Sequence, residues 1–290
     1  MCIRDSYCLG NQIFEDDRNT FFINVKKTSL PQRIVLDFDN CGVARSLINI
    51  FVNLESGAKF EVLDESKYSC NSTLRIFSIL NNGSEFEIYK FNDYSKDYIN
   101  SFFHFSRLNE YSALRDFNFS NGSKHNRCET IVNLDEPYSC YTGSGTIISK
   151  STHSDNIIDI NHNSHSANSD CFFKTVSSGE SMVSFDGNIY VGDGSSNTVS
   201  NQVSKGLLID EKARINLVPK LEINNDDVMC SHGAASGKLD DDTLFYLTSR
   251  GISEEEAKRI YTQGFLGEFT EKIDNAQMKV KAKQYINKHC

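Results

Sequence analysis

The residues best suited to chemistry are a cysteine and a histidine near the carboxy-terminal third of the chain. Cys230 and His232 lie two positions apart in the run VMCSHGAAS. In an extended segment, side chains two positions apart point to the same side. A thiolate and an imidazole on one side are a ligand pair that soft metals and clusters accept. The spacing alone fits a buried cysteine beside a structural histidine equally well.

A second group of candidates lies in the run THSDNIIDINHNSHS. Three histidines there have a spacing at which two imidazoles could share a metal, but no cysteine or carboxylate pattern completes such a site. We therefore interpret them as polar residues on strand edges: His153, His162 and His165. Asp155 and Asp159 of the same run could act as paired acids in glycan cleavage, although two acids in an acidic chain are weak evidence.

Composition excludes several classes of protein. The net charge of −9 and the pI near 5.3 do not supply the basic face that nucleic acids or anionic membranes require. No stretch approaches the roughly 20 apolar residues that span a bilayer, so we expect a soluble protein. No phosphate-binding loop precedes a helix, so any ATP hydrolysis belongs to a partner. The cysteines are scattered without a C-x-x-C pair, which predicts reduced thiols, at positions 2, 8, 41, 70, 128, 140, 171, 230 and 290.

The elements that must position these residues are mostly short strands. Between residues 11 and 221 the apolar pattern repeats every two residues and is interrupted by Asn-Gly and Asp-Gly turns. The segments GAKFEVL, from Gly57, and GSEFEIY, from Gly83, lie 26 residues apart with their Phe-Glu pairs in register. That repeat favours a β-solenoid, in which each coil stacks on the previous one. A repeated hairpin in a sandwich is the alternative.

Helical signals begin after Lys220. Asp240 or a neighbouring aspartate can cap a helix that Gly251 ends, and Ser253 opens a second helix with a capping box. The apolar residues of this hairpin are Leu244, Leu247, Ala257, Ile260, Tyr261 and Phe265. A DNA-reading motif is disfavoured, because the segment from Lys238 to Lys272 contains eight acidic and only five basic residues.

The carboxy-terminal segment resembles a known family. The run LEINNDDVMCSHGAASGKLDDDTLFYLTSRGISEEEAKRIYTQGFLGEF is similar to the signature of the SufB/SufD family of iron-sulfur cluster assembly proteins. The SufD branch fits best, because no cysteine lies between Cys171 and Cys230, where a SufB chain has one shortly before this loop. Matching residues also occur upstream, at Phe173-Lys174, Phe185 to Val191, Gln202 and Leu207-Leu208.

The resemblance implies a mainly β fold. We expect a right-handed parallel β-helix over residues 11–237, followed by a small helical region over residues 238–290. Members of the family normally carry a helical amino-terminal domain, whereas this chain begins with strands. Residues 1–10 are therefore left unassigned, and the amino terminus is predicted to be truncated.

The resemblance also implies a non-catalytic scaffold in a SufBCD complex. A SufB-like subunit pairs through the β-helix, and the ATPase SufC docks on the carboxy-terminal helices. A transient iron-sulfur cluster is shared with SufB, with His232 as the candidate ligand and Cys230 as a weaker one, and this chain alone holds no cofactor. Residues expected to bind SufC are Leu244, Phe245, Leu247, Ile260 and Phe265. We also expect that the chain alone can form a homodimer. The expected location is the cytoplasm or, alternatively, the plastid stroma.

Two other functions remain open from the residues. One is a SufB-like subunit that itself carries the cluster. The other is a β-helical glycan-active protein, which the solenoid pattern and the scattered acids would also fit.

Overall fold

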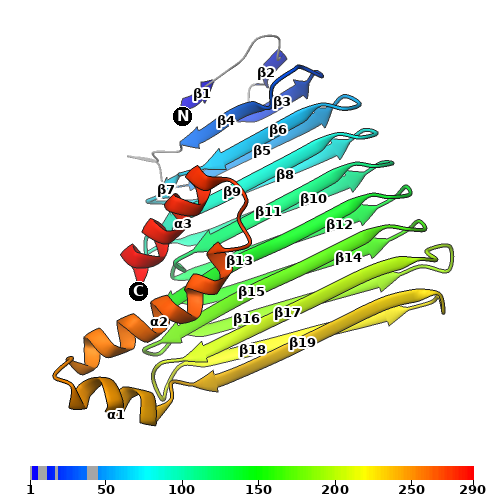
Figure 1. The fold of residues 1–290 in the computed structure, drawn as a ribbon. Helices are drawn as coiled ribbons and strands as arrows, with labels where there is room; N and C mark the ends of the chain where they lie inside the picture. Colours follow the sequence, from blue (N-terminus) through cyan, green and yellow to red (C-terminus); the bar gives the residue numbers. More distant parts are fainter. Residues whose placement is uncertain (1, 6–11, 17–18, 38–44) are drawn as a thin grey trace.

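The protein is a parallel β-solenoid of about eight turns followed by three helices (Figure 1). This computed structural model describes residues 2–5, 12–16, 19–37 and 45–290. The predictions for residues 1 and 6–10 lie outside the described residues. The predicted mainly β fold with a helical carboxy-terminal region is confirmed.

Two sheets form the walls of the solenoid. The ten-stranded sheet contains, in spatial order, β1 (Cys2–Asp5), β4 (Gln32–Asp37), β6 (Lys59–Asp64), β9 (Glu85–Tyr94), β11 (Ala113–Ser120), β13 (Cys140–Lys150), β15 (Asn168–Ser178), β17 (Thr198–Leu208) and β19 (Val228–Lys238), with β7 (Lys67–Tyr68) beside β9. The nine-stranded sheet contains β18 (Arg214–Ile223), β16 (Met182–Val191), β14 (His153–His162), β12 (His125–Leu134), β10 (Ile99–Leu108), β8 (Asn71–Leu80), β5 (Arg45–Leu54), β3 (Thr20–Val25) and β2 (Gln12–Asp16).

Strand pairing is parallel throughout the coils and antiparallel only at β1–β4 and β2–β3, among the described strands. The 26-residue repeat corresponds to one coil, because β6 pairs with β9 and places Phe60 beside Phe86 and Glu61 beside Glu87. The rings of Phe60 and Phe86 stack with centroids 5.5 Å apart. Parallel pairing excludes the repeated hairpin of a sandwich, whose neighbouring strands would run antiparallel.

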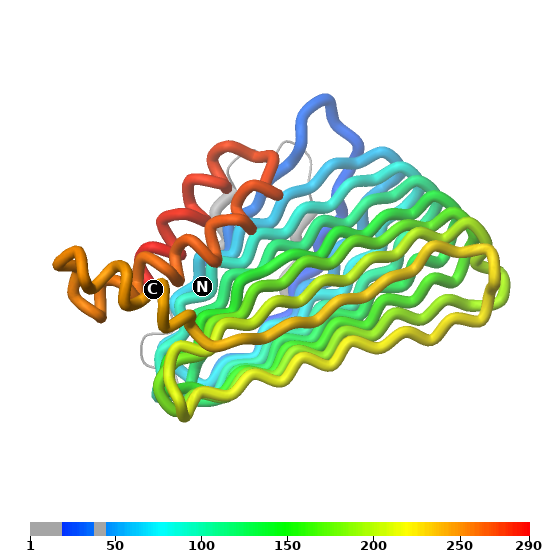
Figure 2. Tube along the Cα trace, turned by 60° about the horizontal axis from the view of Figure 1, so that its bottom comes forward, coloured from blue at the N-terminus to red at the C-terminus, as the bar shows by residue number. Residues whose placement is uncertain are grey.

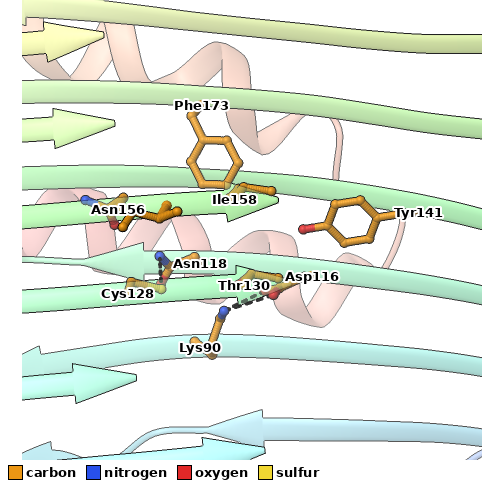
Figure 3. A pocket seen from close by; sticks show the side chains of 10 residues that line it. Lys90, Asp116, Asn118, Cys128, Thr130, Tyr141, Asn156, Ile158 and Phe173 are labelled. Carbon is orange, nitrogen blue, oxygen red and sulfur yellow. Dashed lines mark hydrogen bonds and ion pairs between the residues drawn. The ribbon is translucent and has the colours of Figure 1, made fainter. Parts of the chain in front are cut away.

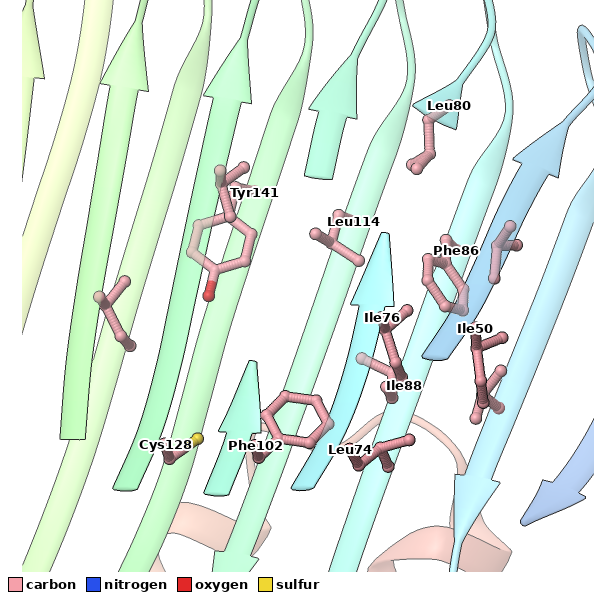
Figure 4. Close-up of a cluster of buried hydrophobic side chains, with 14 of the residues drawn as sticks. Ile50, Leu74, Ile76, Leu80, Phe86, Ile88, Phe102, Leu114, Cys128 and Tyr141 are labelled. Carbon is pink, nitrogen blue, oxygen red and sulfur yellow. The ribbon is translucent and has the colours of Figure 1, made fainter. Parts of the chain in front are cut away.

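The core fills the space between the two sheets. Side chains alternate along each strand, and the inward set forms one continuous apolar cluster along the axis. Figure 4 shows Leu74, Ile76, Phe86, Leu114 and Tyr141 of successive coils meeting in this interior. Stacking therefore supplies the burial that no single coil could supply alone.

A buried ion pair interrupts the apolar core. Lys90 of β9 lies 2.7 Å from Asp116 of β11, and both side chains are almost completely buried (Figure 3). Burial alone raises the pKa of the Asp116 carboxyl, but the Lys90 ammonium and His104 outweigh it and hold this pKa below its usual value. Burial lowers the pKa of His104. A small cavity of about 10 Å³ lies beside this pair, bounded also by Asn118 and Tyr141.

Three helices follow the last strand: α1 (Asp241–Ser249), α2 (Glu254–Thr270) and α3 (Ala276–His289). The predicted caps are present, since Asp240 accepts a hydrogen bond from the Thr243 backbone N–H and Ser253 accepts one from that of Glu256. Gly251 has φ of +87° and follows α1, in the left-handed conformation that glycine tolerates best. The two predicted helices are thus present, and α3 lies within the region predicted to be helical, although it was not predicted as a separate helix.

The helices α2 and α3 cover the outer face of the ten-stranded sheet. α2 runs back along the solenoid over β13 and β15, and α3 then turns in the opposite direction and lies near β9 (Figures 1 and 2). A second core forms there from outward aromatic residues of the sheet and apolar residues of both helices, including Phe119, Phe269 and Tyr285. The Tyr285 hydroxyl donates to the Asn92 carbonyl oxygen at 2.7 Å, which ties α3 to β9.

Candidate functional site

The candidate ligands lie on β19, the last strand of the ten-stranded sheet. β19 pairs with β17 on one side and has no further strand on the other, within the part of the chain that the structure describes. Figure 2 views the solenoid toward this end, where β18 and β19 are the last strands of the two sheets. Nearly all residues of β19 are exposed, so the end of the interior is open to solvent.

Cys230 and His232 share one face of β19, as their spacing predicted. They lie beside the inward-facing Ser200 and Gln202 of β17, respectively. Cys230 is half-buried and packs against the edge of the main core, whereas His232 is exposed. Burial raises the pKa of the Cys230 thiol, although a backbone hydrogen bond from Ser200 opposes the shift. The thiol is therefore a poor ligand while it is protonated, and the accessible imidazole is the better one.

A hydrogen-bonded track of buried side chains approaches Cys230 from inside. His162 Nε2 lies 2.9 Å from Ser169 Oγ, which lies 2.6 Å from Ser200 Oγ, one strand away from Cys230. Burial lowers the pKa of His162 to about 4, so its imidazole is neutral at neutral pH. The sequence does not reveal this track, because its members are brought together only by stacking of the coils.

The three histidines of the THSDNIIDINHNSHS run do not meet. His162 points into the core, His165 lies exposed near Ser166, and His153 faces outward from β14. The three histidines do not share a metal with one another, but their interpretation as strand-edge residues is wrong for His162, which is completely buried because it faces the interior of the solenoid. Asp155 and Asp159 lie four residues apart on one strand, or about 13 Å, which exceeds the separation of paired glycosidase carboxylates.

The residues predicted to bind an ATPase lie in two different environments. Phe245 is 74 % exposed and its neighbour Tyr246 is 54 % exposed, and α1 buries none of its residues. Leu244 and Leu247 are half-buried, and Ile260 is 40 % exposed. The ring of Phe265 is instead turned toward the solenoid, with the Lys174 ammonium 4.5 Å from its centroid.

The fold and the open end define a class of protein: a parallel β-solenoid whose last strand is exposed and whose carboxy-terminal helices cover part of one outer face. Comparison with known sequences gives the family. The protein-family model described as "SUF system FeS cluster assembly, SufBD core domain" matches residues 40–265, and the chain belongs to that family. The predicted family resemblance is confirmed.

Individual relatives match shorter segments. Protein ABCI7, chloroplastic, of Arabidopsis thaliana is 39 % identical over 110 residues, which cover 38 % of this chain and 23 % of that protein. Iron-sulfur cluster assembly protein SufD of Escherichia coli is 36 % identical over 120 residues, covering 41 % and 28 %. Iron-sulfur cluster assembly protein SufB of Bacillus subtilis is 32 % identical over 132 residues, covering 46 % and 28 %. The matched segments thus span about a quarter of each relative's length.

No helix in the described parts of the chain is long and apolar enough to cross a membrane.

Proposed function

We propose that this chain is a SufD-like scaffold subunit for iron-sulfur cluster assembly. In this role it pairs with a SufB-like subunit through the end of the solenoid, docks a SufC-like ATPase through its carboxy-terminal helices, and performs no catalysis itself. The observation that carries the proposal is the bare strand β19 with His232 at its middle, in a chain of the SufBD family.

β19 is suited to adding a strand from a partner. An exposed edge presents unpaired backbone N–H and C=O groups, which natural proteins normally protect with charges or proline. From Val228 to Gly237, β19 has no Asp, Glu, Lys, Arg or Pro. The neighbouring end strand β18 is protected by Arg214, Pro219 and Lys220. The contrast supports β19 as the side on which a second solenoid, SufB-like or a second copy of this chain, would pair.

A cluster at this edge would be cargo held between two subunits. His232 offers one exposed imidazole, and the protonated Cys230 adds little until it loses its proton. One histidine cannot hold an iron-sulfur cluster alone, since such clusters are usually bound by four ligands. The remaining ligands would come from the partner, so the cluster is transient and shared.

A variant of the candidate ligand tests the cluster role. The chain is co-expressed with SufB-like and SufC-like partners, with His232→Ala as the test and His165→Ala, an exposed histidine on a turn, as the control. We expect both variants to co-purify with the partners, while His232→Ala alone loses the visible absorption of the reconstituted cluster. Normal cluster content in His232→Ala would remove His232 from the role.

The ATPase docking surface is proposed to be the exposed side of α1 and the start of α2. Phe245 and Tyr246 are large, exposed and adjacent, and Ile260 adds a third exposed apolar side chain. Truncation at Lys238 would strip the cover from the ten-stranded sheet, so a point variant is the better test. We expect Phe245→Ala with Tyr246→Ala to abolish capture of the SufC-like ATPase. Val280→Ala, at an apolar site on α3 that is about as exposed as Tyr246, should leave capture unchanged. Equal capture by both variants would place the dock elsewhere.

A SufB-like role is the second candidate, because the B. subtilis SufB match covers 46 % of the chain. The two roles are separated by the preferred partner. When SufB-like and SufD-like proteins are offered together, a SufD-like chain should form a heterodimer with the SufB-like protein. Preferential pairing with the SufD-like protein would favour the SufB-like role. The bacterial and chloroplast relatives suit a cytoplasmic or plastid-stromal location for either.

A further inference from the structure

A cluster of two histidines and one aspartate lies on the outer face of the nine-stranded sheet, far along the chain from the β19 site. His125 begins β12, His153 begins β14, and Asp155 follows two residues later on the same face of β14. One ligand atom from each of the three residues lies within 4.8 Å of the other two.

Stacking of the coils fixes this arrangement. β12 and β14 pair in parallel, and the imidazoles of His125 and His153 stack with centroids 4.7 Å apart, close to the spacing of adjacent strands. The His153 backbone N–H also donates to the Ser123 carbonyl oxygen. The backbone that carries all three side chains is therefore held by strand pairing before any ligand arrives.

The carboxylate of Asp155 lies beside the Nε2 atoms at the edge of the two stacked rings. Its oxygens are 3.2 Å from His125 Nε2 and 3.3 Å from His153 Nε2. For tetrahedral coordination with bonds of about 2.0–2.1 Å, neighbouring ligand atoms are separated by about 3.3 Å. Each nitrogen lies near a different oxygen of the carboxylate, Oδ2 for His125 and Oδ1 for His153, and both separations are close to that of two ligand atoms on one ion.

Nearby charges leave the carboxylate available. Arg127 is the residue of β12 that lies beside Asp155, but its guanidinium is held by Glu129 at 3.0 Å and 3.2 Å. Within the described chain, the only ion-pair partners of Asp155 are His125 and His153. The three side chains are between 26 % and 43 % exposed, so an ion can reach them from solvent.

We propose that His125, His153 and Asp155 bind a divalent transition-metal ion of the Zn²⁺ or Fe²⁺ type. Two imidazoles and one carboxylate are ligands that these borderline ions accept, and hard ions such as Mg²⁺ prefer an all-oxygen set. Three protein ligands leave at least one coordination position for water or for a ligand from another molecule. The site does not depend on the scaffold role, because it lies on a different strand pair from Cys230 and His232.

Equilibrium dialysis with elemental analysis tests the site. The intact chain is dialysed against Zn²⁺, and separately against Fe²⁺ without oxygen, in a Cys230→Ser, His232→Ala background that removes the candidate ligands on β19. The test variant is Asp155→Asn. The control is Asp159→Asn, the same change on the same face of the same strand. Circular dichroism verifies the fold of each variant.

We expect one ion per chain, with Asp155→Asn weakening the affinity by at least about tenfold and Asp159→Asn leaving it unchanged. A double variant, His125→Gln with His153→Gln, should abolish binding. Co²⁺ offered to the intact chain should develop visible absorption bands that disappear in the double variant. Absence of stoichiometric binding of both Zn²⁺ and Fe²⁺, or equal affinity in the Asp155→Asn and Asp159→Asn chains, would overturn the proposal.

Discussion

The two outer faces of the solenoid carry similar rows of aromatic residues in opposite environments. On the ten-stranded sheet, Tyr89 and Phe117 stack 4.7 Å apart and are buried in the core shared with α2 and α3. On the nine-stranded sheet, Phe22 and Phe51 stack 5.0 Å apart, yet they are 44 % and 38 % exposed. Ring stacking therefore follows from the in-register coils alone, and burial is added only where the helices lie.

The largest expected difference between the faces is in stability. Phe269→Ala should lower the free energy of unfolding by about 3–5 kcal/mol, because the fully buried Phe269 ring fills the core under α2 against Phe119. Phe51→Ala on the bare face should cost only about 1 kcal/mol, since it removes mainly ring stacking. Urea denaturation measures both values. Equal losses would mean that the helices do not form a cooperative unit with the sheet.

A smaller effect should depend on pH. Lys174 is almost completely buried under α2, where its ammonium donates to Glu268 and to the Phe265 carbonyl oxygen. The Lys174 ammonium holds the pKa of Glu268 below its ordinary value of 4.5. Because that pKa is lowered by folding, its contribution to stability is present above pH 4.5 and is lost as the pH falls through the folded value.

Glu268→Gln tests this pair. The variant should lose about 1 kcal/mol at pH 7, because the Glu268 side chain is 60 % exposed and solvent weakens the pair. Wild type and variant should converge in stability as the pH falls below the folded-state pKa. The measurement is a series of urea titrations across pH, and a gap that stays constant to low pH would contradict the assignment.

The smallest effect is expected at the rim of the helical cover. Lys281 of α3 forms an ion pair with Glu65, and both side chains are partly exposed. Lys281→Ala should change the free energy of unfolding by less than about 1 kcal/mol, because exposed pairs contribute little and are screened by salt. A thermal melt at low and high salt checks this. A loss as large as that of Phe269→Ala would show that charge, and not apolar packing, holds α3 in place.

Much of the fold was predictable from local patterns. The Phe-Glu repeat at Phe60 and Phe86 predicted that successive coils stack, and the caps at Asp240 and Ser253 predicted where α1 and α2 begin. The position of the helices was not predictable, because it depends on contacts between residues that are far apart in the chain. A signal was present in β11, where Phe117 and Phe119 alternate with polar residues and lie on the outward face that the helices cover, since a face left in solvent would be polar.

The candidate sites divide in the same way. Cys230 and His232 were found because they are neighbours in sequence and their strand periodicity is simple. The partnership of His125 and His153 was missed because the two residues lie 28 positions apart. That distance equals one coil at this level of the solenoid, as the hydrogen bond between Asn126 and Ser154 shows. The 26-residue period of the phenylalanines points from His125 to Ser151, so the longer coil at this level had to be known before the two histidines could be paired.

One row of side chains bears on how such a protein changes length during evolution. Asn53, Asn81 and Asn109 each donate an amide hydrogen bond to the asparagine one coil earlier, beginning with Asn24. Each amide meets an identical amide, so a whole coil inserted into or removed from this row recreates the same contacts. Gene duplication in units of one coil is therefore a conservative route to longer or shorter members, whereas a partial coil would break the row.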